Sequence, residues 1–221
     1  MANVRDKNEA APEYRKSTNR EYFESICIAV ILALFVLTFV VQAYKIPTGS
    51  MENNLLIGDH LLVNKFVFAP TRTGLEDALL PIDPIRRGDI LVFKYPEDPN
   101  RDFVKRTIAL PGETVELRNK VVYINGQPLD EPYVRFLFGA EPDAGGIADF
   151  DVRRNYGPVT VPADHYFMMG DNRDNSQDSR YWGFMPRSYV KGKALFVYFS
   201  FGEDSSGPGG IRWSRLLHQI H

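Results

Sequence analysis

Residues 44–51 read YKIPTGSM and directly follow a long apolar run. Pro47 lacks a backbone N–H and restricts the residue before it, so a helix entering this stretch is expected to end here. From Tyr44 to Ser50 the chain can extend at most about 20 Å, at roughly 3.3–3.6 Å per residue. If the apolar run lies in a membrane, Ser50 is held close to the membrane surface.

The apolar run over residues 26–44 approaches the ~20 residues needed to cross a bilayer core. It is longer than the ~7–15-residue apolar region of a signal peptide, and no small-x-small cleavage site follows it. We therefore predict a permanent single-pass transmembrane anchor over 26–44, after a flexible tail at 1–25 in which the helix begins near Thr18 to Glu21. Five lysines and arginines precede the run, whereas only Lys45 and Lys65 follow within about 20 residues. This asymmetry predicts a cytoplasmic N-terminus and an extracytoplasmic remainder.

Composition excludes several classes of protein. The net charge of -2 over 221 residues gives no basic face for nucleic acid. The one cysteine, Cys27, rules out an intramolecular disulfide. The four histidines show no zinc-ligand spacing, so we expect no metal site and no cofactor. About 175 residues follow the run, enough for one domain with a core and a small insertion.

Short segments rich in Val, Ile and Phe, separated by Gly and Pro, follow Ser50 and are typical of strands. Asn125-Gly126 is the signal for a type I′ hairpin turn. Only 73–80 and Ile211–Ile220 have helical patterns. The predicted fold is mostly β: one transmembrane helix, then an antiparallel β domain over 45–221 with a smaller inserted β lobe at about 118–157. The expected strands are 59–68, 89–95, 102–110, 121–124, 127–129, 159–161, 166–169 and 193–201.

Ser50 is a candidate nucleophile, although most lone serines are ordinary turn residues. Gly49 before it permits an unusual backbone angle and close approach of another chain. The Thr48 hydroxyl and the Ser50 N–H can both donate to a developing oxyanion. There is no Gly-x-Ser-x-Gly motif and no nearby histidine, so a histidine-based triad is not indicated. A hydrolytic Ser50 needs another base.

Lys105 is the candidate base. Strand alternation puts it on one face with Phe103 and Thr107, whereas Arg106 points the other way. A lysine acting as a base must be neutral, so its pKa must fall from ~10.4 by about three units, which requires about 4 kcal/mol of desolvation. Local pattern alone favours the alternative, a strand lysine that reaches solvent.

Residues 170–186, GDNRDNSQDSRYWGFMP, are rich in acids but lack the glycine and glutamate positions of an EF-hand. An ordered polar loop, with Asp178 and Arg180 paired, explains them better.

Together these stretches resemble the bacterial type I signal peptidases, membrane-bound Ser-Lys proteases that remove signal peptides from exported preproteins. The resemblance runs from the apolar run to the C-terminus, with the family's boxes in order. They are Ser50-Met51, 87–93, 105–113 and 170–186. The sequence departs from the family at Asn53-Asn54, where a Pro-Thr pair is usual.

The resemblance implies that Ser50 is the nucleophile and Lys105 the general base of an acyl-enzyme mechanism. It implies cleavage after small-x-small (Ala-x-Ala) sites, with Thr48 and the Ser50 N–H as the oxyanion hole. Ser176 is implied to orient the lysine, and Asp178 and Arg180 to support the site as an ion pair. Two further candidates for supporting residues are Met51 and Gly170; for Met51, a plain core position is the alternative.

The resemblance also implies a place in the cell and a set of partners. The place is the bacterial cytoplasmic (inner) membrane, with the catalytic domain on the extracytoplasmic side. The partners are preprotein signal peptides, the lipid bilayer and the nearby Sec translocon. Candidates for a membrane-facing apolar surface are strand 196–201 and the segment around Trp213, for which a core position is an equal alternative.

Two other readings remain. A self-cleaving Ser-Lys repressor is disfavoured by the apolar run and by the lack of a preceding helix-turn-helix segment. A catalytically silent anchored β-module that binds exported chains predicts loss of Ser50 or Lys105, and both are present.

Overall fold

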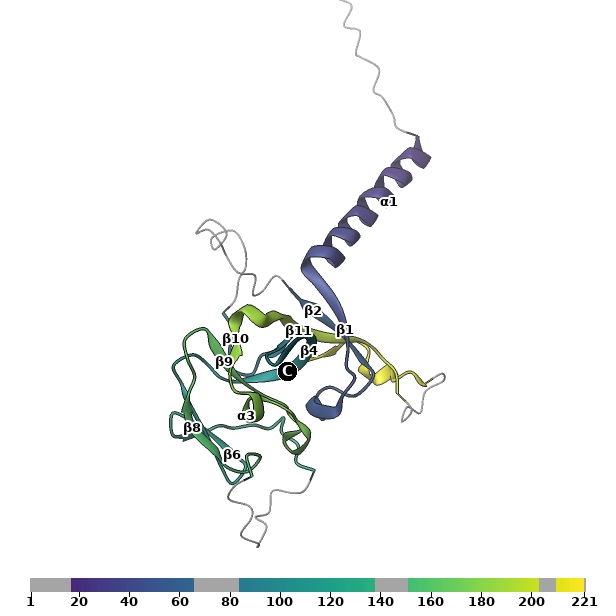
Figure 1. Ribbon diagram of the computed structural model, residues 1–221. Coiled ribbons are helices and arrows are strands. Elements are labelled where there is room, and N and C mark those ends of the chain that lie inside the picture. Colours follow the sequence, from purple (N-terminus) through teal and green to yellow (C-terminus); the bar gives the residue numbers. More distant parts are fainter. Residues whose placement is uncertain (1–16, 66–83, 138–150, 203–209, 221) are drawn as a thin grey trace, which may run out of the picture. The chain divides into compact units, whose positions relative to one another are not determined.

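The computed structural model of the chain describes residues 17–65, 84–137, 151–202 and 210–220 (Figure 1). The chain divides after Thr38 into two units. In its described part the first unit is helical, and the second contains two antiparallel sheets.

Helix α1 (Thr18–Phe35) continues into a π-helical turn, η1 (Val36–Val40). Together they are long and apolar enough to cross a membrane, and none of their side chains is buried in protein. An apolar helix with no protein core around it is suited to lipid. The helix starts at Thr18, within the range 18–21 that the sequence predicts for its beginning.

The predicted C-terminal boundary of the span over 26–44 is corrected. Residues Val41–Lys45 are not helical but form strand β1, which pairs antiparallel with β2 (Asp59–Asn64). The Lys65 N–H also donates to the Val40 carbonyl at 2.9 Å. The backbone groups at the end of the apolar run therefore pair with a neighbouring strand. A short apolar sequence alone does not show whether it forms a helix or a strand.

The larger sheet has the order β1-β2-β11-β3-β4-β9-β10, and β12 also pairs with β11. Strand β3 and the second half of β4 are buried on both faces, which places β4 in the middle of the unit. The remaining strands of this sheet are β3 (Ile90–Tyr95), β4 (Asp98–Ala109), β9 (His165–Met169), β10 (Met185–Pro186), β11 (Val190–Ser200) and β12 (His218–Gln219).

The smaller sheet, labelled β6 and β8 in Figure 1, has the order β7-β6-β5-β8. Asn125 and Gly126 both have positive φ, 51° and 80°, as the predicted type I′ turn requires. A buried apolar cluster joins β4 and β9 of the larger sheet to β5 and β6. The strands are β5 (Thr114–Arg118), β6 (Val121–Ile124), β7 (Gln127–Pro128) and β8 (Tyr156–Thr160).

The prediction of a helix over Ile211–Ile220 is wrong. This segment contains one 3₁₀ turn, η8 (Trp213–Arg215), and then strand β12. The Arg215 guanidinium turns inward to bind the fully buried Asp59 at 2.6 Å and the Asn54 carbonyl at 2.7 Å. The helix predicted at 73–80 lies outside the described residues. The other short helices are η2 (Gly49–Met51), η5 (Arg173–Asn175), α3 (Ser179–Trp182) and η6 (Arg187–Tyr189).

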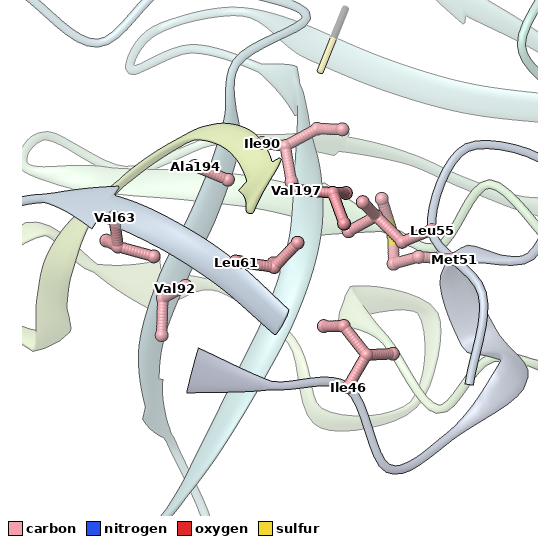
Figure 2. Close-up of a cluster of buried hydrophobic side chains, with 9 residues drawn as sticks. All are labelled: Ile46, Met51, Leu55, Leu61, Val63, Ile90, Val92, Ala194 and Val197. Carbon is pink, nitrogen blue, oxygen red and sulfur yellow. The ribbon is translucent and has the colours of Figure 1, made fainter. Parts of the chain in front are cut away.

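The stretch around Ser50 belongs to a hydrophobic core (Figure 2). Ile46, Met51 and Leu55, which flank the serine, are at most 3% exposed. They pack against buried side chains of β2, β3 and β11. The serine is therefore carried by the core of the domain and not by a loose tether.

Leu61 in this core is fully buried, whereas Leu137 is 44% exposed. We expect Leu61→Ala to lower the free energy of unfolding by about 2–5 kcal/mol, because it leaves a cavity. The matched Leu137→Ala should cost less than about 1 kcal/mol. Urea unfolding of the detergent-solubilised chain, followed by tryptophan fluorescence, measures both. Equal losses in the two variants would contradict the core assignment.

Candidate active site

Ser50 lies in the 3₁₀ turn η2, and residues 49–54, which contain η2 and the three residues after it, are called the serine turn below. Asn172 holds the main chain of this turn. The Asn172 side chain donates to the Gly49 carbonyl at 3.0 Å, and its backbone N–H donates to the Ser50 carbonyl at 3.2 Å. The C=O and N–H of one trans peptide point in opposite directions. The Ser50 N–H, in the same peptide group as the Gly49 carbonyl, therefore points away from Asn172.

Lys105, on β4, is 4% exposed, and its Nζ lies 2.7 Å from Ser50 Oγ. The amine also donates to the Val104 carbonyl at 3.1 Å. Burial lowers the pKa of Lys105 to about 8, against the charges of Asp178 and Asp171, and Arg180 lowers it further. A lowered pKa is what a lysine needs in order to act as a base. At pH values above about 8 the neutral amine predominates and can accept the serine proton.

An open groove of about 470 Å³ runs past the serine and lysine. Thr48 lines it, and its side chain does not cap the turn that follows, so the hydroxyl is not used there. Met51 borders the groove and is also part of the core, at 1% exposure. The groove is lined by residues 44–48, 50–51, 101–105, 175 and 177.

Asp178 and Arg180 form the expected ion pair, 2.8 Å apart, with both side chains fully buried. Burial by itself would raise the pKa of Asp178, but the charge and hydrogen bonds of Arg180 hold that pKa below its usual value. Asp178 also accepts from the Gly170 N–H at 3.1 Å, and Arg180 donates to the Arg173 carbonyl at 2.7 Å. The pair thus fixes the loop that faces the serine.

Gly170 stands where a larger residue has no room. A Cβ atom here would lie 2.4 Å from the Ser50 carbonyl oxygen and 2.3 Å from Ser176 Oγ. Glycine therefore permits the loop to approach the serine turn closely.

Ser176 is 7% exposed and lies close enough to Asp178 to help lower the pKa of that carboxyl. Its hydroxyl does not reach standard hydrogen-bond geometry with any described group. The hydrogen bonds of the Lys105 amine within the described residues go to Ser50 and Val104.

Sequence reasoning did not identify Asn172, nor the pairing of Arg106 with Asp171. The latter two side chains are at most 2% exposed and form a two-bonded ion pair at 2.7 and 2.8 Å. The sequence does contain a hint of this pair, because an arginine in a buried strand and an acidic loop both need partners of opposite charge. Among the described residues no group of His, Cys, Asp or Glu is arranged to hold a metal ion.

Comparison with known proteins gives a consistent result. The sequence model of the family described as "Signal peptidase, peptidase S26" matches residues 19–199. The chain is 36% identical to signal peptidase I of Pseudomonas aeruginosa over 228 residues, covering 88% of this chain and 79% of the relative. It is 33% identical to signal peptidase I of Aquifex aeolicus, covering 91% and 92%. It is 36% identical to signal peptidase I P of Bacillus subtilis subsp. natto, covering 85% and 92%.

The lowered pKa of Lys105 predicts how Ser50 reactivity depends on pH. Below about 8 the amine is protonated and cannot accept the serine proton; above it the neutral form predominates. The rate at which a serine-directed acylating reagent modifies Ser50, followed by mass spectrometry, should rise with pH and reach half its maximum near pH 8. Lys105→Arg should abolish the reaction, since a guanidinium stays charged. A flat profile, or a midpoint near 10.4, contradicts the pairing.

Proposed function

The chain belongs to the signal peptidase family, peptidase S26, and on that premise we propose that it cleaves its substrates with Ser50 as nucleophile and Lys105 as general base. Membership of the family makes it a peptidase that acts on preproteins bearing signal peptides. The observation that supports the dyad is the 2.7 Å contact between the buried lysine amine and the serine hydroxyl.

In the proposed mechanism, neutral Lys105 takes the proton of Ser50 as Oγ attacks the carbonyl carbon of the residue before the cut. The Ser50 N–H and the Thr48 hydroxyl donate to the oxyanion that forms. Lys105 then protonates the departing amine, which leaves an acyl-serine. Lys105 next accepts a proton from water as the water oxygen attacks the ester. It then gives this proton to the departing Ser50 Oγ, which restores the serine hydroxyl and the neutral amine.

The supporting residues keep this arrangement in place. The ion pair of Asp178 with Arg180 and the close approach at Gly170 hold the loop against the serine turn. Ser176 lies within this loop, and its buried hydroxyl is close to Asp178. Its proposed role is to orient Lys105. Met51 supports the floor of the groove from the core.

The proposed specificity is for small residues at the first and third positions before the cut, as in Ala-x-Ala. An extended peptide places these two side chains on the same side of its backbone. The groove is lined in part by residues of β1 and of β4, and such extended strands suit an extended peptide.

Cleavage of a detergent-solubilised preprotein with an Ala-x-Ala site tests the function. We expect cleavage after the second alanine, and loss of at least about 10²–10⁴-fold in rate for Ser50→Ala and for Lys105→Ala. Lys94→Ala, at an exposed position on the neighbouring strand β3, is the matched lysine control and should retain the rate. Phenylalanine in place of the second alanine should block cleavage.

Each outcome of this assay has a distinct meaning. Substantial activity in folded Lys105→Ala shows that the base is misassigned. Failure of folded wild type to cut supports the alternative of an anchored module that binds exported chains. Cleavage of the phenylalanine substrate refutes the specificity alone.

The N-terminal apolar helix is consistent with a membrane-anchored protein. The proposed arrangement is a single crossing of the bacterial cytoplasmic membrane, with a cytoplasmic N-terminus and the catalytic domain on the extracytoplasmic side. The excess of lysine and arginine before the helix supports it. There the enzyme meets preproteins close to the Sec translocon from which they emerge.

A lipid-facing surface on the catalytic domain is part of the same proposal. Trp213 is 60% exposed and Leu217 71%, and Phe201, which bridges to Ile211, is 51% exposed. Exposed aromatic and aliphatic side chains of this kind are typical of contact with a bilayer interface. The exposure favours this reading of the Trp213 segment over a core position.

Fluorescence quenching tests this surface, because Trp182 and Trp213 are the chain's two tryptophans. In vesicles containing lipids brominated on their acyl chains, Trp182→Phe, which keeps Trp213, should be strongly quenched. The reciprocal variant Trp213→Phe, which keeps the half-buried Trp182, should be quenched far less. Quenching of Trp213 by aqueous acrylamide but not by brominated lipid would contradict lipid contact.

A further inference from the structure

The second half of the serine turn contacts a segment that follows the hairpin of the smaller sheet. This segment is Glu131–Arg135, called the 131–135 segment below. The Asn53 side chain donates to the Tyr133 carbonyl at 3.0 Å. The Arg135 guanidinium lies 3.5 Å from the Glu52 carboxylate. Two adjacent residues of the turn therefore touch a part of the chain about 80 residues away.

Buried charges hold the 131–135 segment in place. The Arg173 side chain, 2% exposed, forms a two-bonded ion pair with Glu131, with one bond of 2.9 Å. The Tyr133 ring packs on the guanidinium of Arg106, whose central carbon lies 3.8 Å from the ring centroid. Arg106 is itself paired with the buried Asp171. The segment is thus attached to β4, which also carries Lys105, and to the loop that follows β9.

The backbone makes the same connection. The Arg135 N–H donates to the Asp171 carbonyl at 2.8 Å, and the Arg173 N–H donates to the Arg135 carbonyl at 3.0 Å. Both bonds flank Asn172, whose side chain and N–H bind the carbonyls of Gly49 and Ser50. Hydrogen bonds therefore join the 131–135 segment to the loop around Asn172, and Asn172 in turn to the serine turn.

The φ angle of Asn53 indicates that the serine turn is stabilised by contacts with another part of the chain. Its φ is 114°, in a region that few non-glycine residues adopt, although asparagine does so more readily than most. Proline, with φ fixed near -65°, cannot adopt this angle. The turn is therefore not stiffened by a ring at this position, and the hydrogen bond from Asn53 to Tyr133 restrains it from outside.

We propose that the 131–135 segment positions the nucleophile: through Asn53 it fixes the Ser50 turn relative to Lys105. The inference rests on the proposed function and adds positioning residues to it. Asn53 does not line the groove, so it acts on the geometry of the dyad and not on substrate binding. Its loss should therefore lower kcat and leave KM unchanged.

The test is Asn53→Gly, because glycine keeps access to positive φ and removes only the side-chain bond. We expect kcat for preprotein cleavage to fall about 3- to 10-fold, the effect of one modest hydrogen bond, with KM and the pH midpoint unchanged. Asn53→Asp keeps the shape, but a carboxylate cannot donate to the Tyr133 carbonyl, so kcat should fall at least as far.

Asn125→Gly is the matched control. Asn125 also has positive φ, 51°, and its side chain also makes one hydrogen bond, accepting from the Thr114 N–H at 2.8 Å. It lies in the hairpin turn between β6 and β7, outside the groove. We expect it to leave kcat unchanged. If Asn53→Gly retains kcat within twofold, or if Asn125→Gly loses as much, the inference is overturned.

Amide hydrogen exchange separates this inference from the proposed function. In Asn53→Gly, peptides covering residues 46–58 should exchange faster than in wild type, whereas Asn125→Gly should leave them unchanged. If wild type cuts no preprotein, the proposed function fails and this exchange result alone decides the role of the 131–135 segment. Unchanged exchange in Asn53→Gly would overturn that role.

Discussion

The structure depends on one contact: the buried amine of Lys105 lies 2.7 Å from the hydroxyl of Ser50. The surrounding residues must keep this amine buried and hold the two groups together. Burial favours the neutral form of Lys105, but two carboxylates act in the opposite direction, Asp178 and Asp171. Each of these carboxylates is paired with a buried arginine, Arg180 and Arg106 respectively. The charge of Arg180 acts together with burial to lower the pKa of Lys105, against the effect of the two acids. The pair of Asp178 with Arg180 is therefore part of what sets the protonation state of the lysine.

The polar loop after β9 connects these charged groups to the main chain of Ser50. Asp178 accepts from the Gly170 N–H, and Asn172 binds the carbonyls on either side of the Ser50 N–H. Gly170 permits the contact, because any Cβ there would collide with the Ser50 carbonyl oxygen. One loop thus controls the charge near the lysine and the orientation of the serine turn.

Local patterns in the sequence predicted much of the fold, whereas most residues of the candidate site came from the resemblance to the signal peptidases. For Lys105, local pattern alone favoured a side chain that reaches solvent, but the structure buries it. Strand alternation placed Lys105 and Arg106 on opposite faces, and Asn125-Gly126 predicted a turn that the structure contains. The failures have a common cause. Ile211–Ile220 has helical spacing, but Arg215 is drawn to Asp59, 156 positions earlier. Asn172 was missed because its partner, Gly49, is 123 positions away, and no local pattern reports such a contact.

The link between Arg215 and the beginning of the domain also bears on the order in which the protein assembles during synthesis. Arg215 binds the Asp59 carboxylate and the carbonyl of Asn54, which lies within the serine turn. Neither bond can form until residue 215 has been added to the growing chain and has left the ribosome. Ser50 is synthesised among the first residues of the domain, yet the turn that carries it gains this support only when residue 215 is in place. A partly made chain therefore carries the serine without all the contacts that hold it.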